Sequence, residues 1–329
     1  MIRPFQLRDS ALVHRLGEGG VVLQAETALT ASPHPLRSAL LHMLVGGHHS
    51  TYIWKSEEGN ASAFVQLYWE DDYSTARLAC LGTDIDRNGT GDHSNLDETV
   101  WLDLLDQLVI EAGHRGVHSL IAEVSESGDE LSLLRRAGFV IYARQDIWVS
   151  EEAKDIEPSS QLITHEAVDD WDVHVLYSNV VPRLIQSVEP TPPLTGGQNW
   201  LLREDGELAA YVHVNEGPVA SWMRLFIHPN ASTQPEAIIQ SAMHKIQPTE
   251  QHPLFFCIRR YQSWLQTPLE QAGFSHWGSQ AVMVKHVARR VESPTPIVKP
   301  VLEPQTVPSS SPLVQRFGDE NGNGRGPKK

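Results

Sequence analysis

The chain has 329 residues, of which 40% are hydrophobic and 20% are charged. This apolar content is enough for folded cores, and the length predicts about two domains. Asp and Glu outnumber Lys and Arg by 41 to 26, so the net charge is −15. Because such a surface repels nucleic-acid phosphates and anionic lipid headgroups, we expect neither nucleic-acid nor membrane binding.

The sequence also predicts the compartment. The apolar stretch at residues 39–45 is interrupted by His42 and is far shorter than the roughly 20 residues of a membrane-spanning helix. The first ten residues carry charges and lack the apolar core of a signal peptide. Cys80 and Cys257 both lie in apolar runs, which is typical of buried thiols in a reducing compartment. We therefore expect a cytoplasmic protein without disulfides.

The first part of the chain alternates helix and strand patterns. Residues 2–6 predict a strand, and Asp9 is a candidate N-cap for a helix that carries Leu12, Val13 and Leu16 at helical spacing. Residues 35–45 predict another helix, which ends before two glycines. The other elements expected here are strands over 51–55, 61–69 and 75–82, a helix over 96–113, a strand over 118–124, a short helix near 129–137 and closing strands around 139–149.

The second part of the chain repeats the later elements of the first. The sequence Leu134-Arg-Arg-Ala-Gly-Phe139 recurs 135 residues later as Leu269-Glu-Gln-Ala-Gly-Phe274. The expected elements are strands over 199–204, 207–215 and 219–228, a helix over 235–246, a strand over 254–259, a helix over 262–272 and strands over 274–287. This order predicts a mixed α/β (α+β) sheet with helices packed on its faces, built twice.

Three regions follow from this repeat. We expect a first domain at 1–152, a second and degenerate copy at 153–291, and a disordered tail at 292–329 that is rich in proline and glycine. The tail is either a solvated terminus without a role or a proline-rich docking segment.

The element order resembles the GNAT superfamily of N-acetyltransferases in a tandem arrangement. The similarity rests on Ile2-Arg-Pro4, Arg8-Asp9 and Arg135–Phe139 in the first copy, and on Phe226–Pro229 and Gln271–Phe274 in the second. The resemblance implies two GNAT-like domains, acetyl-CoA as the acyl donor, and a small-molecule or peptide amine as the acceptor.

In that family a Q/R-x-x-G-x-G/A loop holds the pyrophosphate of acetyl-CoA, because its backbone N–H groups and a helix N-terminus form an anion cradle. The first copy has Arg87, Gly89 and Gly91, one residue short of the family spacing, and these are the candidate cofactor residues; the alternative is a flexible loop. The second copy has no glycine over 230–236, and Pro235 removes one N–H donor. There, Thr233-x-x-Glu236 predicts a capping box that fills the helix N-terminus. We expect weak acetyl-CoA binding or none, with the first copy favoured.

The catalytic signals are also incomplete. Leu134 and Leu269 stand where the resemblance implies a general-acid tyrosine. Glu123, on the same side of its strand as Ile121, is the candidate general base; the alternative is a strand-end or surface glutamate. His42, His48 and His49 lack metal-ligand spacing, so no metal is expected.

Two functions remain open at this stage. The first is an acyl-CoA-dependent N-acyltransferase that transfers an acetyl group to an amine. The second is a non-catalytic tandem module that binds a ligand or a protein partner. The sequence leaves the acceptor, the acyl chain and the oligomeric state undetermined.

Overall fold

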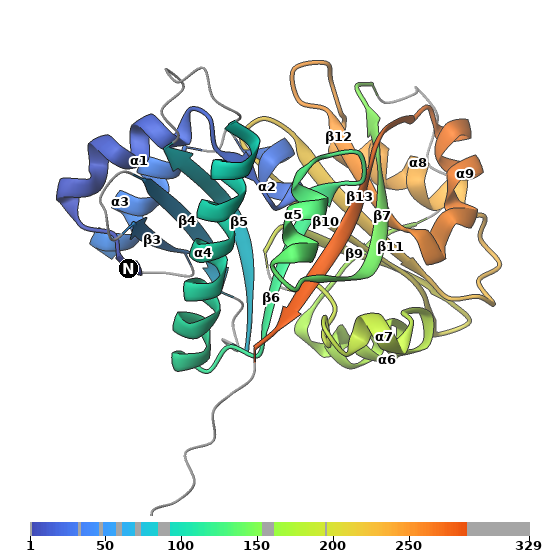
Figure 1. Cartoon of the computed structure of the whole chain (residues 1–329). Coiled ribbons are helices and arrows are strands. Elements are labelled where there is room, and N and C mark those ends of the chain that lie inside the picture. Colours follow the sequence, from blue (N-terminus) through green and yellow to red (C-terminus); the bar gives the residue numbers. More distant parts are fainter. Residues whose placement is uncertain are drawn as a thin grey trace, which may run out of the picture. The chain divides into compact units, whose positions relative to one another are not determined.

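The computed structural model describes residues 2–31, 34–45, 49–56, 61–69, 74–84, 93–152, 161–194 and 196–287. The expected tail at 292–329 and the candidate cofactor residues Arg87, Gly89 and Gly91 lie outside these residues. Below, the N-terminal half denotes the described part of residues 2–152, and the C-terminal half denotes the described part of residues 161–287 (Figure 1).

The N-terminal half begins with two short strands and four helical segments and continues with a strand-rich region. Its elements are β1 (Ile2–Pro4), η1 (Leu7–Asp9), α1 (Ser10–Gly17), β2 (Val21–Val22), α2 (Ala25–Thr30), α3 (Pro35–Val45), β3 (His49–Lys55), β4 (Ser62–Trp69), β5 (Thr75–Asp84), α4 (His93–His114), β6 (Ser119–Ser125), α5 (Glu130–Arg136) and β7 (Val140–Ser150).

The C-terminal half has the same order from β9 onward except for the added η3, and among its described residues it has no counterpart of β2 and one helix fewer before its main strands. Its elements are β8 (Ile163–Thr164), η2 (Ala167–Asp169), α6 (Asp170–Val180), α7 (Arg183–Gln186), β9 (Gln198–Glu204), β10 (Glu207–Glu216), β11 (Ser221–Ile227), α8 (Pro235–Ile246), β12 (Leu254–Arg259), η3 (Arg260–Leu265), α9 (Gln266–Ala272) and β13 (Ser275–His286). The helix expected over 262–272 is therefore divided into η3 and α9.

The described strands form one sheet in the order β1-β3-β4-β5-β6-β13-β7-β12-β11-β10-β9-β8, with β2 paired to β5. In each half four antiparallel strands lead to a parallel pair, β5 with β6 and β11 with β12. The sheet thus contains two copies of one strand order, and the mixed architecture expected from the sequence is confirmed.

The final strands are exchanged between the halves. The sequence suggested a pair of closing strands in each copy, but each half has one long strand, β7 or β13. Strand β13 pairs with both β6 and β7, and β7 also pairs with β12. The last strand of each half therefore pairs with a strand of the other half. This exchange cannot be predicted from the sequence of either copy alone.

An internal twofold relation lies at the centre of this exchange. Gln145 and Gln280 are 135 residues apart, the same offset as the sequence repeat, and they are direct partners across β7 and β13. Gln145 Nε2 donates to Gln280 Oε1 at 2.8 Å, and Gln145 is fully buried. Equivalent residues of the two copies therefore meet as they would in a symmetric dimer.

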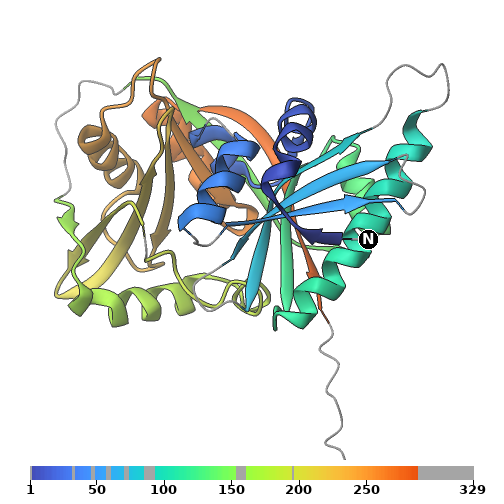
Figure 2. The same ribbon diagram turned by 90° about the vertical axis from the view of Figure 1, so that its left-hand side faces the viewer.

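Helices cover both faces of the sheet. In the N-terminal half α4 packs on one face over Leu78 and Leu120, while α1 packs on the other over Ile53 and Phe64. The C-terminal half repeats this arrangement, with α8 and α9 on one side of the strands and α6 and α7 on the other (Figures 1 and 2). Burial of these apolar faces stabilises the layers.

A repeated turn begins the first long helix of each half. The helix after Asp9 was expected with that residue as its N-cap; it begins at Ser10, but Asp9 makes no cap hydrogen bond into it. Instead Asp9 accepts from the Gln6 N–H at 2.9 Å and from Arg3 at 2.6 Å. Asp169 does the same with the Glu166 N–H and with Arg203. Each aspartate therefore joins the turn to the sheet.

Candidate functional site

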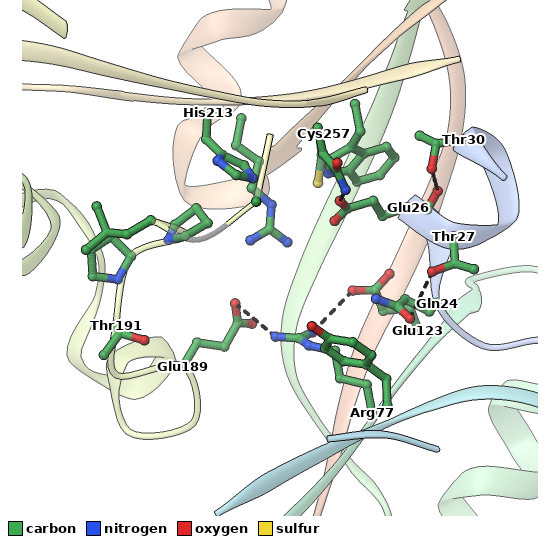
Figure 3. Close-up of a pocket in the computed structure, with 18 of the residues that line it drawn as sticks. Gln24, Glu26, Thr27, Thr30, Arg77, Glu123, Glu189, Thr191, His213 and Cys257 are labelled. Atoms are coloured by element: carbon green, nitrogen blue, oxygen red, sulfur yellow. Dashed lines mark hydrogen bonds and ion pairs between the residues drawn. The ribbon is translucent and has the colours of Figure 1, made fainter. Parts of the chain in front are cut away.

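A cavity of about 850 Å³ lies at the junction of the two halves, and we call it the junction cavity. Its walls come from α2, β5 and β6 of the N-terminal half and from α6, β10, β11, β12 and residues 189–194 of the C-terminal half. Figure 3 shows side chains from several of these elements gathered around one space. This volume is in the range of sites that enclose a small molecule.

A buried ion cluster centred on Glu189 forms one wall of the junction cavity. Arg259 Nη2 donates to Glu189 Oε1 at 2.7 Å, the Tyr142 hydroxyl donates to the same oxygen, and Arg77 lies 3.9 Å from Oε2. Burial by itself would raise the pKa of Glu189, but the charges of Arg259 and Arg77 outweigh it and lower the pKa to about 2. Glu189 is therefore a fixed anion and a poor proton acceptor at neutral pH.

Glu123 lines this cavity from β6, on the side that the sequence predicted. It is only 5% exposed, so the alternative of a surface glutamate is wrong. Its Oε2 accepts the Ala25 N–H at 2.8 Å, and its Oε1 lies 3.7 Å from Arg77, which stands between Glu123 and Glu189 (Figure 3). The carboxylate thus holds the start of α2 and Arg77 in place, and its role as a base stays a prediction.

The gap between the parallel strands of the N-terminal half is filled by the chain itself. Strands β5 and β6 pair only from Thr75 to Arg77 and then separate. In the opening, Val21 and Val22 pair with β5, the Leu23 N–H donates to Ala79 O at 2.9 Å, and the Glu123 N–H donates to Leu23 O at 2.7 Å. The backbone groups of Ala79 and Glu123 that face this gap are therefore already paired.

The corresponding gap in the C-terminal half is bridged by one side chain. Strands β11 and β12 pair from Ser221 to Met223 and then separate. Gln262 Nε2 donates to Leu225 O at 2.7 Å, while its Oε1 accepts the Arg259 N–H at 3.3 Å. A side-chain amide thus substitutes for a strand across this gap.

A second pocket, of about 380 Å³, opens at the carboxyl ends of β11 and β12. It is lined by the end of α6, the loop from β11 to α8, and η3. Tyr261 and Gln262 line both this pocket and the junction cavity. The two hollows therefore lie on either side of these residues at the strand gap, which is the usual place for ligands in sheets with parallel strands.

The loop before α8 holds an internal anion. Glu204 at the end of β9 accepts the Ser232 N–H at 2.7 Å, the Ser232 hydroxyl at 2.8 Å and the Thr233 N–H at 2.8 Å. Hydrogen bonds from Thr233 and Ser232 lower the pKa of Glu204 to about 2. Two successive N–H groups of the loop are therefore occupied by a carboxylate of the chain.

The expected capping box at this helix is wrong. Helix α8 begins at Pro235, its N-cap is Gln234, and no side chain caps it. Glu236 instead accepts from Gln240 Nε2 at 2.8 Å on the helix surface. The carboxylate that binds this loop is that of Glu204, 29 residues before Thr233, which the sequence analysis did not identify.

His213 on β10 presents a neutral imidazole to the junction cavity. The Asn199 amide donates to Leu194 O at 3.0 Å, which leaves Asn199 Oδ1 as the acceptor for His213 Nδ1 at 2.7 Å. Nδ1 therefore carries the proton and Nε2 is the free acceptor. Burial, together with the charge of Arg224, lowers the pKa of His213 to about 4. The side chain is uncharged at neutral pH.

The structure brings only part of the sequence-predicted site together. Glu123 reaches the junction cavity, and Leu134 and Leu269 lie fully buried in the two cores. The sequence analysis missed Glu189, Glu204 and His213, which lie far from any recognisable motif. The only available signal was their polar character within or beside apolar segments, and that signal does not identify their partners.

Among the described residues no cluster of His, Cys, Asp and Glu has the arrangement of a metal site. In the same part of the chain, no helix combines the length and the apolar composition needed to span a membrane. Cys80 and Cys257 are buried free thiols, as the sequence predicted.

Comparison with known proteins supports the fold. No protein-family model matches the sequence, and no curated protein does. A GCN5-related N-acetyltransferase from Sphaerobacter thermophilus matches 87% of this chain and 95% of its own, with 11% identity and a TM-score of 0.50. A tandem GNAT protein from the clavulanic acid biosynthesis pathway matches 88% of this chain and 99% of its own, with 13% identity and a TM-score of 0.51.

A third structure extends the comparison to a larger protein. The GCN5-related glucosamine N-acetyltransferase region of a fungal multi-domain GH3 β-N-acetylglucosaminidase matches 87% of this chain and 38% of its own, with 10% identity and a TM-score of 0.51. Together with the repeated strand order, these matches show that the chain has a tandem GNAT-like fold. At these identities they show the fold alone.

Proposed function

We propose that this protein is a ligand-binding module with a tandem GNAT-like fold, in which the chain itself closes both places where an acyl-CoA would bind. The observation that carries this proposal is the internal use of the binding groups. Residues 21–23 occupy the gap between β5 and β6, and Glu204 occupies the loop amides before α8. A pyrophosphate has to displace a carboxylate that already satisfies those donors and repels it.

The junction cavity is the binding site in this proposal. It has the volume of a small-molecule site, and its wall combines aromatic side chains with the buried charged groups of Glu123, Glu189 and Arg259. Burying charged groups costs free energy unless they are paired, and clusters of buried charged groups are common at functional sites. The ion cluster in the wall therefore makes this cavity a candidate functional site.

Titration of the full chain with acetyl-CoA by calorimetry tests the proposal. We expect a dissociation constant weaker than about 100 µM, equivalent to about −5.5 kcal/mol. Micromolar binding, together with release of free CoA when a mixture of amines is added, contradicts it.

An acyl-CoA-dependent N-acyltransferase is the second candidate, and one observation favours it. The pocket beside α8 and the junction cavity lie on either side of Tyr261 and Gln262, so a donor and an acceptor amine could approach one point from two sides. Acetyl-CoA would supply an activated acetyl thioester. His213 Nε2 would accept the amine proton, and burial raises the pKa of Tyr261 to about 12, which keeps its hydroxyl protonated.

For the N-terminal half, Arg87, Gly89 and Gly91 as phosphate ligands and Glu123 as the base remain proposals of this second candidate. His213→Asn and Glu123→Gln separate the two bases, because only the variant that removes the working base should abolish CoA release. If neither variant releases less CoA than the wild type, both assignments are wrong.

We also propose that the two copies divide at residues 152 and 153 and that the protein works in the cytoplasm. The repeated strand order supports the division, and the two free buried thiols are typical of a reducing compartment.

A further inference from the structure

We propose that Arg224 and Arg259 bind the carboxylate of a small amine-bearing acid in the junction cavity. This inference rests on the proposal that the cavity binds a ligand, and it names the chemical class of that ligand. It follows from the way the charges of the cavity wall are paired.

Arg224 is the arginine of the wall that has no counterion among the described residues. It lies on β11, where Trp222, Arg224 and Phe226 line the cavity and the alternate residues enter the core beneath α8. Its Nε is buried and has no hydrogen-bond partner, and no described carboxylate lies within ion-pair distance of its guanidinium. An unpaired guanidinium in such a place costs free energy, so a ligand anion would stabilise it.

Arg259 on β12 supplies a second open donor. The side chain is only 6% exposed, and its Nη2 is used by Glu189. Its Nη1 is buried and has no hydrogen-bond partner among the described residues. Arg224 and Arg259 are also close enough for each to oppose the charge of the other. Two guanidinium groups therefore face the cavity, and Glu189 is bonded to Arg259 but not to Arg224.

The other groups of the wall do not supply the missing anion. Glu123 is engaged by Arg77 and the Ala25 N–H, and Glu26 accepts from Asn215 Nδ2 at 2.6 Å. Cys257 stays a neutral thiol because burial raises its pKa to about 11, and His213 is neutral as shown above. Glu216 lies at the exposed rim, where it accepts from Gln198. A carboxylate from outside the chain would match the two donors that have no partner among the described residues, Arg224 Nε and Arg259 Nη1.

The acidic side chains explain why the ligand also carries an amine. Glu26 keeps one carboxylate oxygen without a hydrogen-bond partner among the described residues, and Glu123 stands on the same wall of the cavity (Figure 3). A dianion such as phosphate would be repelled by Glu26, Glu123 and Glu189. A molecule with one carboxylate and one ammonium group matches both signs of charge. Trp222, Phe226 and Tyr177 give the remaining wall an aromatic surface.

Thermal unfolding of the full chain, without acyl-CoA, tests this proposal with four probes at matched ionic strength. The probes are L-tryptophan, indole-3-propionate, tryptamine and inorganic phosphate. L-Tryptophan carries both a carboxylate and an amine, indole-3-propionate carries only the carboxylate, and tryptamine carries only the amine. Inorganic phosphate is an anion that has neither group. We expect L-tryptophan to raise the unfolding midpoint most, indole-3-propionate less, and tryptamine and phosphate little or not at all.

Arg224→Met removes the charge while keeping an unbranched apolar chain. Without ligand we expect this variant to unfold at a higher temperature than the wild type, because a half-buried charge without a counterion in the described part of the chain has been removed. Its response to the carboxylate probes should weaken by about tenfold or more, since a charge-assisted contact is lost. Arg203→Met is the matched control, because Arg203 pairs with Asp169 and Asp172 away from the cavity. It should lower the midpoint and keep the probe response.

The proposal is overturned if Arg224→Met lowers the midpoint as Arg203→Met does, because Arg224 is then a structural residue. It is also overturned if neither carboxylate probe stabilises the wild type more than the variant, or if phosphate stabilises it more than the carboxylates. None of these results depends on acetyl-CoA binding, so failure here is distinct from failure of the proposed function.

Discussion

Glu204 illustrates how one side chain can decide the chemistry of a loop. The successive N–H groups of Ser232 and Thr233 form an anion cradle, and the Glu204 carboxylate fills it. A bound anion from solution has to compete with a group that is tethered to the same sheet. The loop therefore keeps the shape of an anion site while being closed to anions.

Glu204→Ala should strengthen acetyl-CoA binding, because it frees two N–H donors and removes a negative charge next to them. Calorimetric titration of the variant measures the change, and Glu204→Gln, which keeps the shape and loses the charge, should lie between the variant and the wild type. Equal affinities for all three proteins would mean that the loop is not part of any phosphate site.

His213 predicts a pH dependence of stability. Its pKa falls from 6.5 in the unfolded chain to about 4 in the folded protein, so the unfolded state binds more protons between these values. Stability should therefore decrease as the pH falls from about 6.5 to 4, by up to about 3 kcal/mol from this residue. Urea unfolding at several pH values should show a smaller decrease for His213→Gln.

The control is His244→Gln on the exposed surface of α8, which should follow the wild type. Glu204 and Glu189 have lowered pKa values and lose their contributions below about pH 4.5, so the interval above that value isolates His213. A His213→Gln curve parallel to the wild type would show that folding does not lower the pKa of His213.

Strand β2 has only two residues, but it helps to hold β5 and β6 together. Together with Leu23 it connects β5 to β6 by backbone hydrogen bonds across the gap in the N-terminal half. Leu23 is 1% exposed and packs in the core beneath α4. The segment is therefore an integral part of the sheet.

Leu23→Ala should destabilise the protein by about 2–5 kcal/mol, because it leaves a cavity in this core. Denaturant unfolding monitored by tryptophan fluorescence measures the change. Leu44→Ala, at a position that is 76% exposed on α3, is the control and should have little effect. A small effect of Leu23→Ala would show that residues 21–25 detach easily and that the gap can open.

The exchange of β7 and β13 makes the two halves depend on each other. Removing β13 would separate β6 from β7, and removing β7 would leave β12 without a neighbour on that side. Because each half completes the sheet of the other, neither contains a full set of strands.

The described part of the chain should therefore unfold in a single cooperative transition. Scanning calorimetry should give equal calorimetric and van't Hoff enthalpies, although the sequence contains two copies of one unit. Chains that span only 1–152 or only 153–291 should be unfolded or should associate with a second copy. Two separate transitions of the full chain would show that the exchanged strands contribute little to coupling.

The fold could be predicted well from local patterns. The boundaries of α8 and β12 match the expected ones, and the Leu-x-x-Ala-Gly-Phe repeat correctly indicated duplicated elements. The side of β6 that carries Glu123 also followed from strand alternation. The partner of an exchanged strand could not be read in this way, because β7 has the same apolar pattern whichever strand it pairs with.

The type and order of the elements, the repeat and the absence of a glycine-rich phosphate loop in the second copy follow from the sequence alone, since these depend on residues close together in the chain. The groups that meet in the junction cavity, in contrast, are brought together by tertiary packing. Arg77, Glu123, Glu189 and Arg259 come from four separate segments, and Glu204 reaches a loop 28 residues away. Electrostatic pairing acts over a few ångströms in space, so it follows from the packing of distant segments.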